Sequence, residues 1–279
     1  LAETDSSPTL SSTSLPLKIN NAPLQIRYYR GETLLLAEEQ GYFAADNQHG
    51  FRFALYPRQG GRPVELDNLD QLFQMGRCLG RIHAAGDGYS FKHRQSLSLQ
   101  SMMVDSVEFL LSHDFIPSDL IEAYQSLVDD VIQLCRQQLD AYGELPYISL
   151  HGDCHAGNVL WRDGGPHFVD FDDAISGPAM QDIWMLLSGD RAQRIAQLME
   201  IVEGYNEFYH FDAKQLRLIE VLRAMRMLHY SAWLARRWED PAFPASFTWF
   251  NTARYWSDQI LALREQYAAL QEEPLTLPY

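Results

Sequence analysis

The chain has 279 residues, of which 46% are hydrophobic and 21% are charged, and its formal net charge at pH 7 is −15. This composition predicts an ordinary globular protein with one large core or two lobes, with no apolar run long enough to cross a membrane. The acidic excess argues against nucleic-acid binding, which needs basic surface. Three widely separated cysteines, Cys78, Cys135 and Cys154, favour reduced thiols and a cytoplasmic location over a disulfide framework.

The first 57 residues predict a small β region. Residues 1–15 are rich in Ser and Thr and poor in large apolar side chains, which indicates a loosely packed start. Alternation of Phe51, Phe53 and Leu55 indicates a strand with one buried face, joined to the preceding strand by a polar loop around 47–50. The extended segments predicted here are 17–19, 24–29, 33–36 and 51–56.

A break with two glycines, PRQGGRP at 57–63, separates this region from a mostly helical remainder. The first helix of the remainder has Asp67 as its expected cap and Gly86 as its expected end. Apolar residues at helical spacing support this helix and the later predicted helices. The predicted helices are 67–86, 99–113, 117–142, 179–188, 191–209, 213–238 and 248–272, with breaks at 176–178 and 239–246.

The most informative stretch runs from residue 147 to residue 173, YISLHGDCHAGNVLWRDGGPHFVDFDD. A short buried strand at 147–150 leads into a polar loop, and the turn RDGG then closes a hairpin. Because the hairpin brings its two ends together, we expect Asp153, Asn158 and Asp170 to converge at one edge.

These three side chains offer two carboxylates and an amide oxygen, which are the ligands that Mg²⁺ prefers. Their order also suits phosphoryl transfer. An early Asp can accept the proton of an attacking hydroxyl, while a later Asn and Asp hold the metal against the phosphates. We therefore expect Asp153 and Asp170 to be catalytic carboxylates, and Asn158 and Asp170 to be the metal ligands. Asp172 competes with Asp170 for the metal, and His151 is expected to anchor the loop.

The stretch HGDCHAGN resembles the HGDxxxxN signature of aminoglycoside phosphotransferases, choline kinases and homoserine-kinase-like enzymes. The segments FVDFDDAISGPAMQDIWMLLSGD, LRAMRM and RRWEDPAFP resemble the bacterial stress response kinase A group of serine/threonine protein kinases more closely still. The resemblance covers roughly residues 20–279.

This resemblance implies an α+β, protein-kinase-like fold of the aminoglycoside phosphotransferase type. Its parts would be a truncated small β lobe at 1–57, a hinge at 58–66 and a large, mostly helical catalytic lobe at 67–279. It also implies ATP and Mg²⁺ as cofactors, and a monomer acting on a protein Ser/Thr hydroxyl. Asp182 would brace the catalytic loop through its backbone, and the adenine ring would meet backbone groups near Ala54, Leu55 and Tyr56.

Several residues have two interpretations. His83 recurs in the family, yet a lone histidine at a helix end is more often structural. Arg223 and Arg226 share a helix face, and a row of solvated ion pairs accounts for them as well as contact with a phosphate or an acidic substrate does. A zinc site or a nucleophile built on Cys154, and a calcium loop at 170–173, lack the spacing that such sites need.

A kinase-like small lobe normally carries a phosphate-covering loop, a strand Lys and a helix Glu. Lys18 is the single lysine before Lys92, and it follows the Ser/Thr-rich start. The sequence therefore predicts that the front of this lobe is missing. Two alternatives to a protein kinase follow: a kinase for small hydroxyl compounds, or an inactive binding module without its nucleotide lobe.

Overall fold

The computed structural model describes the side chains of residues 60–87 and 91–278, and of residues 1–59 it describes the backbone of six strands. Contacts divide the chain into two compact units, Leu1–Gly60 and Gly61–Tyr279. The predicted adenine contacts at Ala54, Leu55 and Tyr56 lie outside the residues whose side chains are described.

The first unit contains an antiparallel four-stranded sheet and a separate hairpin. A strand, β1, forms within the Ser/Thr-rich start, where its backbone pairs with β2. The strand β5, which lies before the polar loop around 47–50, was not predicted, and it pairs with β6 in place of the earlier strand. The strands are β1 (Thr9–Ser12), β2 (Leu15–Asn21), β3 (Leu24–Arg30), β4 (Thr33–Leu36), β5 (Tyr42–Ala45) and β6 (Arg52–Leu55).

The second unit has two small sheets that hold the central hairpin in place. One has the order β10-β9-β7, with β7 at Arg62–Pro63, β9 at Val159–Arg162 and β10 at Gly165–Phe168. The other pairs β8 (Ile148–Leu150) antiparallel with β11 (Ile175–Gly177). The break predicted at 176–178 was therefore wrong for its first two residues, since cross-strand hydrogen bonds to β8 override their turn-like composition.

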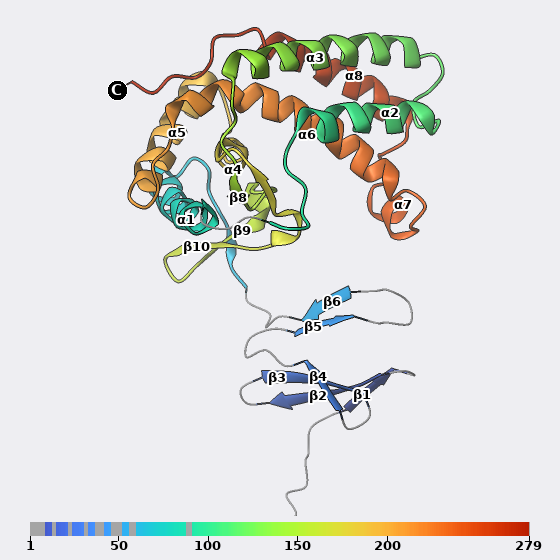
Figure 1. Ribbon diagram of the computed structural model, residues 1–279, viewed down its shortest axis with the longest axis vertical. Helices are drawn as coiled ribbons and strands as arrows, with labels where there is room; N and C mark the ends of the chain where they lie inside the picture. Colours follow the sequence, from blue (N-terminus) through green and yellow to red (C-terminus); the bar gives the residue numbers. More distant parts are fainter. Residues whose placement is uncertain are drawn as a thin grey trace, which may run out of the picture. The chain divides into compact units, whose positions relative to one another are not determined.

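Helices α1 (Leu69–Asp87) and α5 (Arg191–Asn206) lie side by side (Figure 1). Their backbones approach so closely that a Cβ added at Gly76 would collide with the carbonyl of Ile201. The expected cap of α1 moves by one residue, because Asn68 Oδ1, and not Asp67, accepts from the N–H of Gln71 at 3.2 Å. This packing forms the part of the core that contacts the central hairpin, since α1 also contacts β10.

The remaining helices enclose the rest of the core, with α6 in contact with α2, α3, α4 and α8. A π-helical turn at Gln100–Val104 precedes α2, and a 3-10 segment at Ala213–Leu218 precedes α6. The Pro-rich connection predicted at 239–246 was wrong in part, because it contains α7. Pro241 directly precedes this helix and Pro244 lies in its first turn, where a backbone N–H has no partner within the helix. The bounds are α2 (Asp105–Ser112), α3 (Ile121–Tyr142), α4 (Met180–Trp184), α6 (Ile219–Arg236), α7 (Ala242–Ser246) and α8 (Ala253–Ala269).

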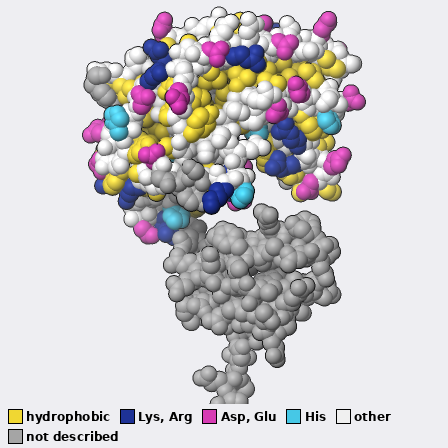
Figure 2. Space-filling model, viewed as in Figure 1, with side chains coloured by type: hydrophobic (Ala, Val, Ile, Leu, Met, Phe, Trp, Pro, Cys, Tyr) yellow, Lys and Arg dark blue, Asp and Glu magenta, His cyan; other side chains and the backbone are white. Residues whose placement is uncertain are grey.

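In the described part of the chain, no helix combines the length and the hydropathy that crossing a lipid bilayer would require. Acidic side chains are dispersed over the face of the second unit shown in Figure 2, and basic side chains form small groups among them. On this face the acidic charge is therefore spread out, with no single acidic patch.

Candidate active site

Asp182, on α4, supports the loop formed by His151, Gly152 and Asp153 from the protein interior. Its fully buried carboxylate accepts from the backbone N–H of His151 at 2.8 Å and from that of Gly152 at 2.9 Å. The prediction that Asp182 braces this loop is confirmed. Two charge-assisted hydrogen bonds to consecutive amides fix the backbone direction just before Asp153.

A buried chain of hydrogen bonds extends from this carboxylate into the interface between α1 and α5. His83 Nε2 lies 3.0 Å from Asp182 Oδ2, and His83 Nδ1 lies 2.8 Å from the Tyr205 hydroxyl. Burial, reinforced by Tyr209 and by Asp182, raises the pKa of the Tyr205 phenol. The phenol therefore stays protonated and can donate a hydrogen bond to the His83 ring. The structural interpretation of His83 is confirmed, because the ring joins the loop support to the helical core.

His151 fixes the loop against the end of the hairpin. Its Nε2 donates to the carbonyl of Val169 at 2.8 Å, and its Nδ1 accepts from the N–H of Asp153 at 3.3 Å. Both ring nitrogens are therefore occupied, and the ring is buried. This arrangement agrees with the prediction that His151 anchors the loop.

Gly152 is required by the backbone of the loop. Its φ is +88°, in the region that side chains disfavour, and a Cβ there would collide with the carbonyl of Asp173. The close approach brings the loop that carries Asp153 against the segment that follows the hairpin.

Two of the three residues predicted to act together, Asp153 and Asn158, are in contact, and Asp170 directly follows the residue that pairs with Asn158. Asn158 Nδ2 donates to the Asp153 carbonyl at 2.9 Å and lies 3.5 Å from Asp153 Oδ2. The Val169 N–H donates to the Asn158 carbonyl at 3.0 Å, so the strand register places Asn158 beside Asp170. Since the Asn158 amide nitrogen is committed to Asp153, its oxygen is the atom available to a cation.

Asp170, Asp172 and Asp173, which follow the hairpin, concentrate negative charge near the loop. Partial desolvation, then the charges of Asp153 and Asp170, raise the pKa of Asp173, against the opposing effect of Arg237 and Arg226. Asp170 itself adopts a left-handed conformation with φ 66°. Such a field is the electrostatic setting in which a divalent cation binds.

In the described ranges, 60–87 and 91–278, no group of three or more His, Cys, Asp or Glu side chains has the arrangement of a metal site. The predicted ligands are instead one carboxylate, from Asp170, and one amide oxygen, from Asn158. That pair fits Mg²⁺, which keeps several waters and is usually held by one or two carboxylates together with substrate phosphates.

Cys154 lies in the middle of the loop but faces the core. The thiol is fully buried, and burial, with Asp182 and Asp153 nearby, raises its pKa well above the ordinary value. A protonated, enclosed thiol is a poor nucleophile and a poor metal ligand. All three cysteines are free.

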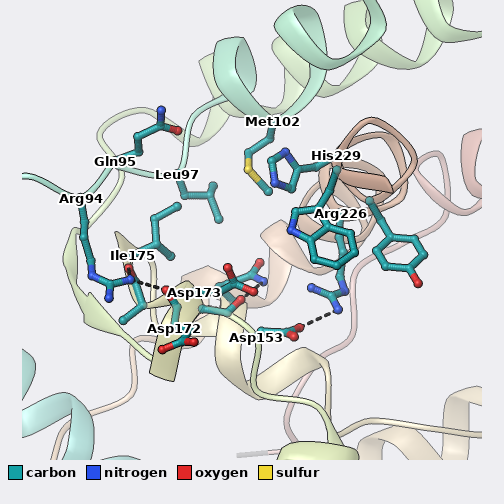
Figure 3. Close-up of a pocket in the computed structure, with 15 residues that line it drawn as sticks. Arg94, Gln95, Leu97, Met102, Asp153, Asp172, Asp173, Ile175, Arg226 and His229 are labelled. Carbon is teal, nitrogen blue, oxygen red and sulfur yellow. Dashed lines mark hydrogen bonds and ion pairs between the residues drawn. The ribbon is translucent and has the colours of Figure 1, made fainter. Parts of the chain in front are cut away.

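A cavity of about 300 Å³ opens in front of Asp153 (Figure 3). One wall is α6, which contributes Arg226, His229, Tyr230 and Trp233. These positions were not predicted as site residues, apart from the open question over Arg226. Their spacing of three, four and seven residues, which places them on one helix face, was the available signal. Arg94 and Ile175 lie across the cavity from Arg226, Leu97 also lines it, and Met102 lies next to His229 (Figure 3).

The family model for the phosphotransferase enzyme family matches residues 21–219. The chain belongs to this family. Stress response kinase A of Escherichia coli (strain K12) is 45% identical over 249 residues, which are 89% of this chain and 72% of the relative. The serine/threonine protein kinase RdoA of Salmonella typhimurium (strain LT2) is 41% identical over the same shares of the two chains. This phosphotransferase is therefore a kinase, as predicted.

Solved structures confirm the predicted fold. An amicoumacin kinase in complex with AMP-PNP, Ca²⁺ and its ligand has a TM-score of 0.59 at 19% identity, covering 99% of this chain and 91% of that one. A microcompartment-associated aminopropanol kinase has a TM-score of 0.60 at 17% identity, covering 98% and 96%. The phosphotransferase has the same protein-kinase-like fold, with a small sheet region and a mostly helical large lobe.

Proposed function

We propose that this phosphotransferase transfers the terminal phosphoryl group of Mg·ATP to a serine or threonine hydroxyl of a protein. The observation that carries the proposal is the position of the Asp153 carboxylate, which is held at the cavity by a buried support and linked to Asn158. The names of the relatives, stress response kinase A and serine/threonine protein kinase RdoA, favour a protein acceptor.

In this proposal Asp153 is the general base. The acceptor oxygen attacks the terminal phosphorus, its proton passes to Asp153, and the bond to the bridging oxygen breaks to release ADP. Asn158 and Asp170 hold the metal, which when bound offsets charge on the phosphates. Backbone groups near Ala54, Leu55 and Tyr56 contact the adenine ring. The enzyme acts as a monomer in the cytoplasm, where its three free cysteines stay reduced.

A labelled-phosphate panel tests the acceptor class. The kinase is incubated with Mg·ATP labelled at the terminal phosphate and with either dephosphorylated casein or a set of small hydroxyl compounds: choline, homoserine, aminopropanol and an aminoglycoside. We expect acid-stable phosphate on serine and threonine of casein. Label confined to a small compound would replace the protein-kinase proposal with a small-molecule kinase. The absence of transfer to every acceptor, water included, would contradict the activity itself.

A further inference from the structure

The Asp153 carboxylate has a cationic partner from a distant part of the chain. Arg226 Nη2, on α6, lies 2.6 Å from Asp153 Oδ1, and both side chains are largely shielded, at 32% and 20% exposure (Figure 3). Although the two atoms are close, Oδ1 is buried and makes no hydrogen bond to any described residue. Because it has almost no exposed surface, this oxygen is held against the guanidinium, and an acceptor must approach the carboxylate at its other oxygen.

The other arginines of this region have different partners. Arg223, one turn earlier on α6, pairs through Nε with Glu220 Oε2 at 3.1 Å and lies over the Trp184 ring. Arg94, on the far wall of the cavity, donates to the carbonyls of Asp172 and Ala174. Of the two arginines whose role the sequence left open, Arg223 therefore pairs on its own helix, and Arg226 reaches the loop carboxylate.

The two oxygens of Asp153 face different surroundings. Oδ2 lies toward Asn158 Nδ2 at 3.5 Å, on the side where Asp170 follows the hairpin. Oδ1 lies toward Arg226 and the α6 wall. A metal held by Asn158 and a guanidinium on α6 would therefore approach the reacting groups from two sides.

The distances limit where a reacting oxygen can be. An acceptor hydroxyl that gives its proton to the Asp153 carboxylate must lie within about 3 Å of its other oxygen, Oδ2. Because Arg226 Nη2 is 2.6 Å from Oδ1 of the same carboxylate, the hydroxyl and the guanidinium cannot be more than about 8 Å apart. The guanidinium is then within reach of the phosphoryl group that this hydroxyl attacks, and its remaining N–H groups are in the planar fork that binds phosphate oxygens.

We propose that Arg226 is a catalytic residue that binds the transferring phosphoryl group while keeping Asp153 directed at the acceptor hydroxyl. The inference rests on the proposed function, in which Asp153 is the base. A carboxylate and a phosphoryl group in one cavity repel each other, and a cation between them offsets this repulsion most in the transition state. The neighbouring His229 does not share the task, because burial, with Arg236 and Arg226 nearby, lowers its pKa to about 4 and leaves it neutral.

Replacement of Arg226 tests the role. With Mg·ATP and casein, and with water as the acceptor in a parallel hydrolysis assay, Arg226→Met should lower kcat by about 100-fold or more while the KM for ATP changes less than threefold. Arg226→Lys should recover part of the loss. Added guanidinium ions should partly restore Arg226→Ala, an effect that a purely structural role would not produce.

Arg223→Met is the matched control, because it removes a guanidinium from the same helix outside the cavity lining. It should keep kcat within threefold, and melting curves should show that the variants are folded. Near-normal kcat in a folded Arg226→Met, or no restoration by guanidinium ions, would overturn the role of Arg226. If Asp153→Asn retained full activity, the proposed function would fail instead, so the two failures are distinguishable.

Discussion

Replacing Asp153 by asparagine is expected to lower kcat by about 1,000-fold and to leave the fold intact. Asparagine has the same shape, and its amide oxygen can still face Arg226, whose Nη2 lies 2.6 Å from the present carboxylate. What it lacks is an atom that can take the proton of the acceptor hydroxyl. Steady-state kinetics with Mg·ATP and casein, together with a thermal melt, measure both effects.

Asp163→Asn is the control for this change. Asp163 lies in the turn of the same hairpin, has a φ of 52° that asparagine also adopts, and is 85% exposed. Its replacement should leave kcat unchanged. A folded Asp153→Asn enzyme with wild-type turnover would refute the assignment of Asp153 as the base.

Replacing Asp182 by asparagine is expected to lower the free energy of unfolding by about 3 kcal/mol or more, and to remove most of the activity. The present carboxylate accepts from the amides of His151 and Gly152 and contacts His83. Asp182, His83 and His151 are buried, and Gly152 is partly buried. An amide has a single accepting oxygen, so at least one of these buried donors would lose its partner. Chemical denaturation monitored by circular dichroism measures the loss.

Asp190→Asn is the matched comparison for Asp182. Asp190 also accepts a backbone N–H, from Gln193 at 2.9 Å, but it does so at the exposed start of α5, where asparagine caps equally well. Its replacement should change stability by less than about 0.5 kcal/mol. Equal effects of the two substitutions would mean that Asp182 does not support the loop as described.

The central hairpin was predictable because its functional residues are near one another in sequence. A strand, a polar loop and a GG turn placed Asn158 beside Asp170 before any tertiary contact was known. The bracing by Asp182 came from the family resemblance, and the structure supplied its two amide partners.

The cavity wall could not be predicted in the same way. The contact between Arg226 and Asp153 joins segments far apart in the chain, and no local pattern specifies which helix face meets the loop. The missed strand β11 has a similar cause. Its Ser and Gly favour turns locally, but β8 offers it backbone hydrogen bonds that outweigh that preference.

The most direct test of the account is the position of Mn²⁺, used in place of Mg²⁺, in crystals of the kinase grown with AMP-PNP. The anomalous difference map should show a peak about 2.0–2.3 Å from the Asn158 amide oxygen and from an Asp170 carboxylate oxygen. Asp153 should lie outside the metal's coordination shell, facing the acceptor cavity. A peak held by Asp172 and Asp173 instead, or no peak near the hairpin, would contradict the account.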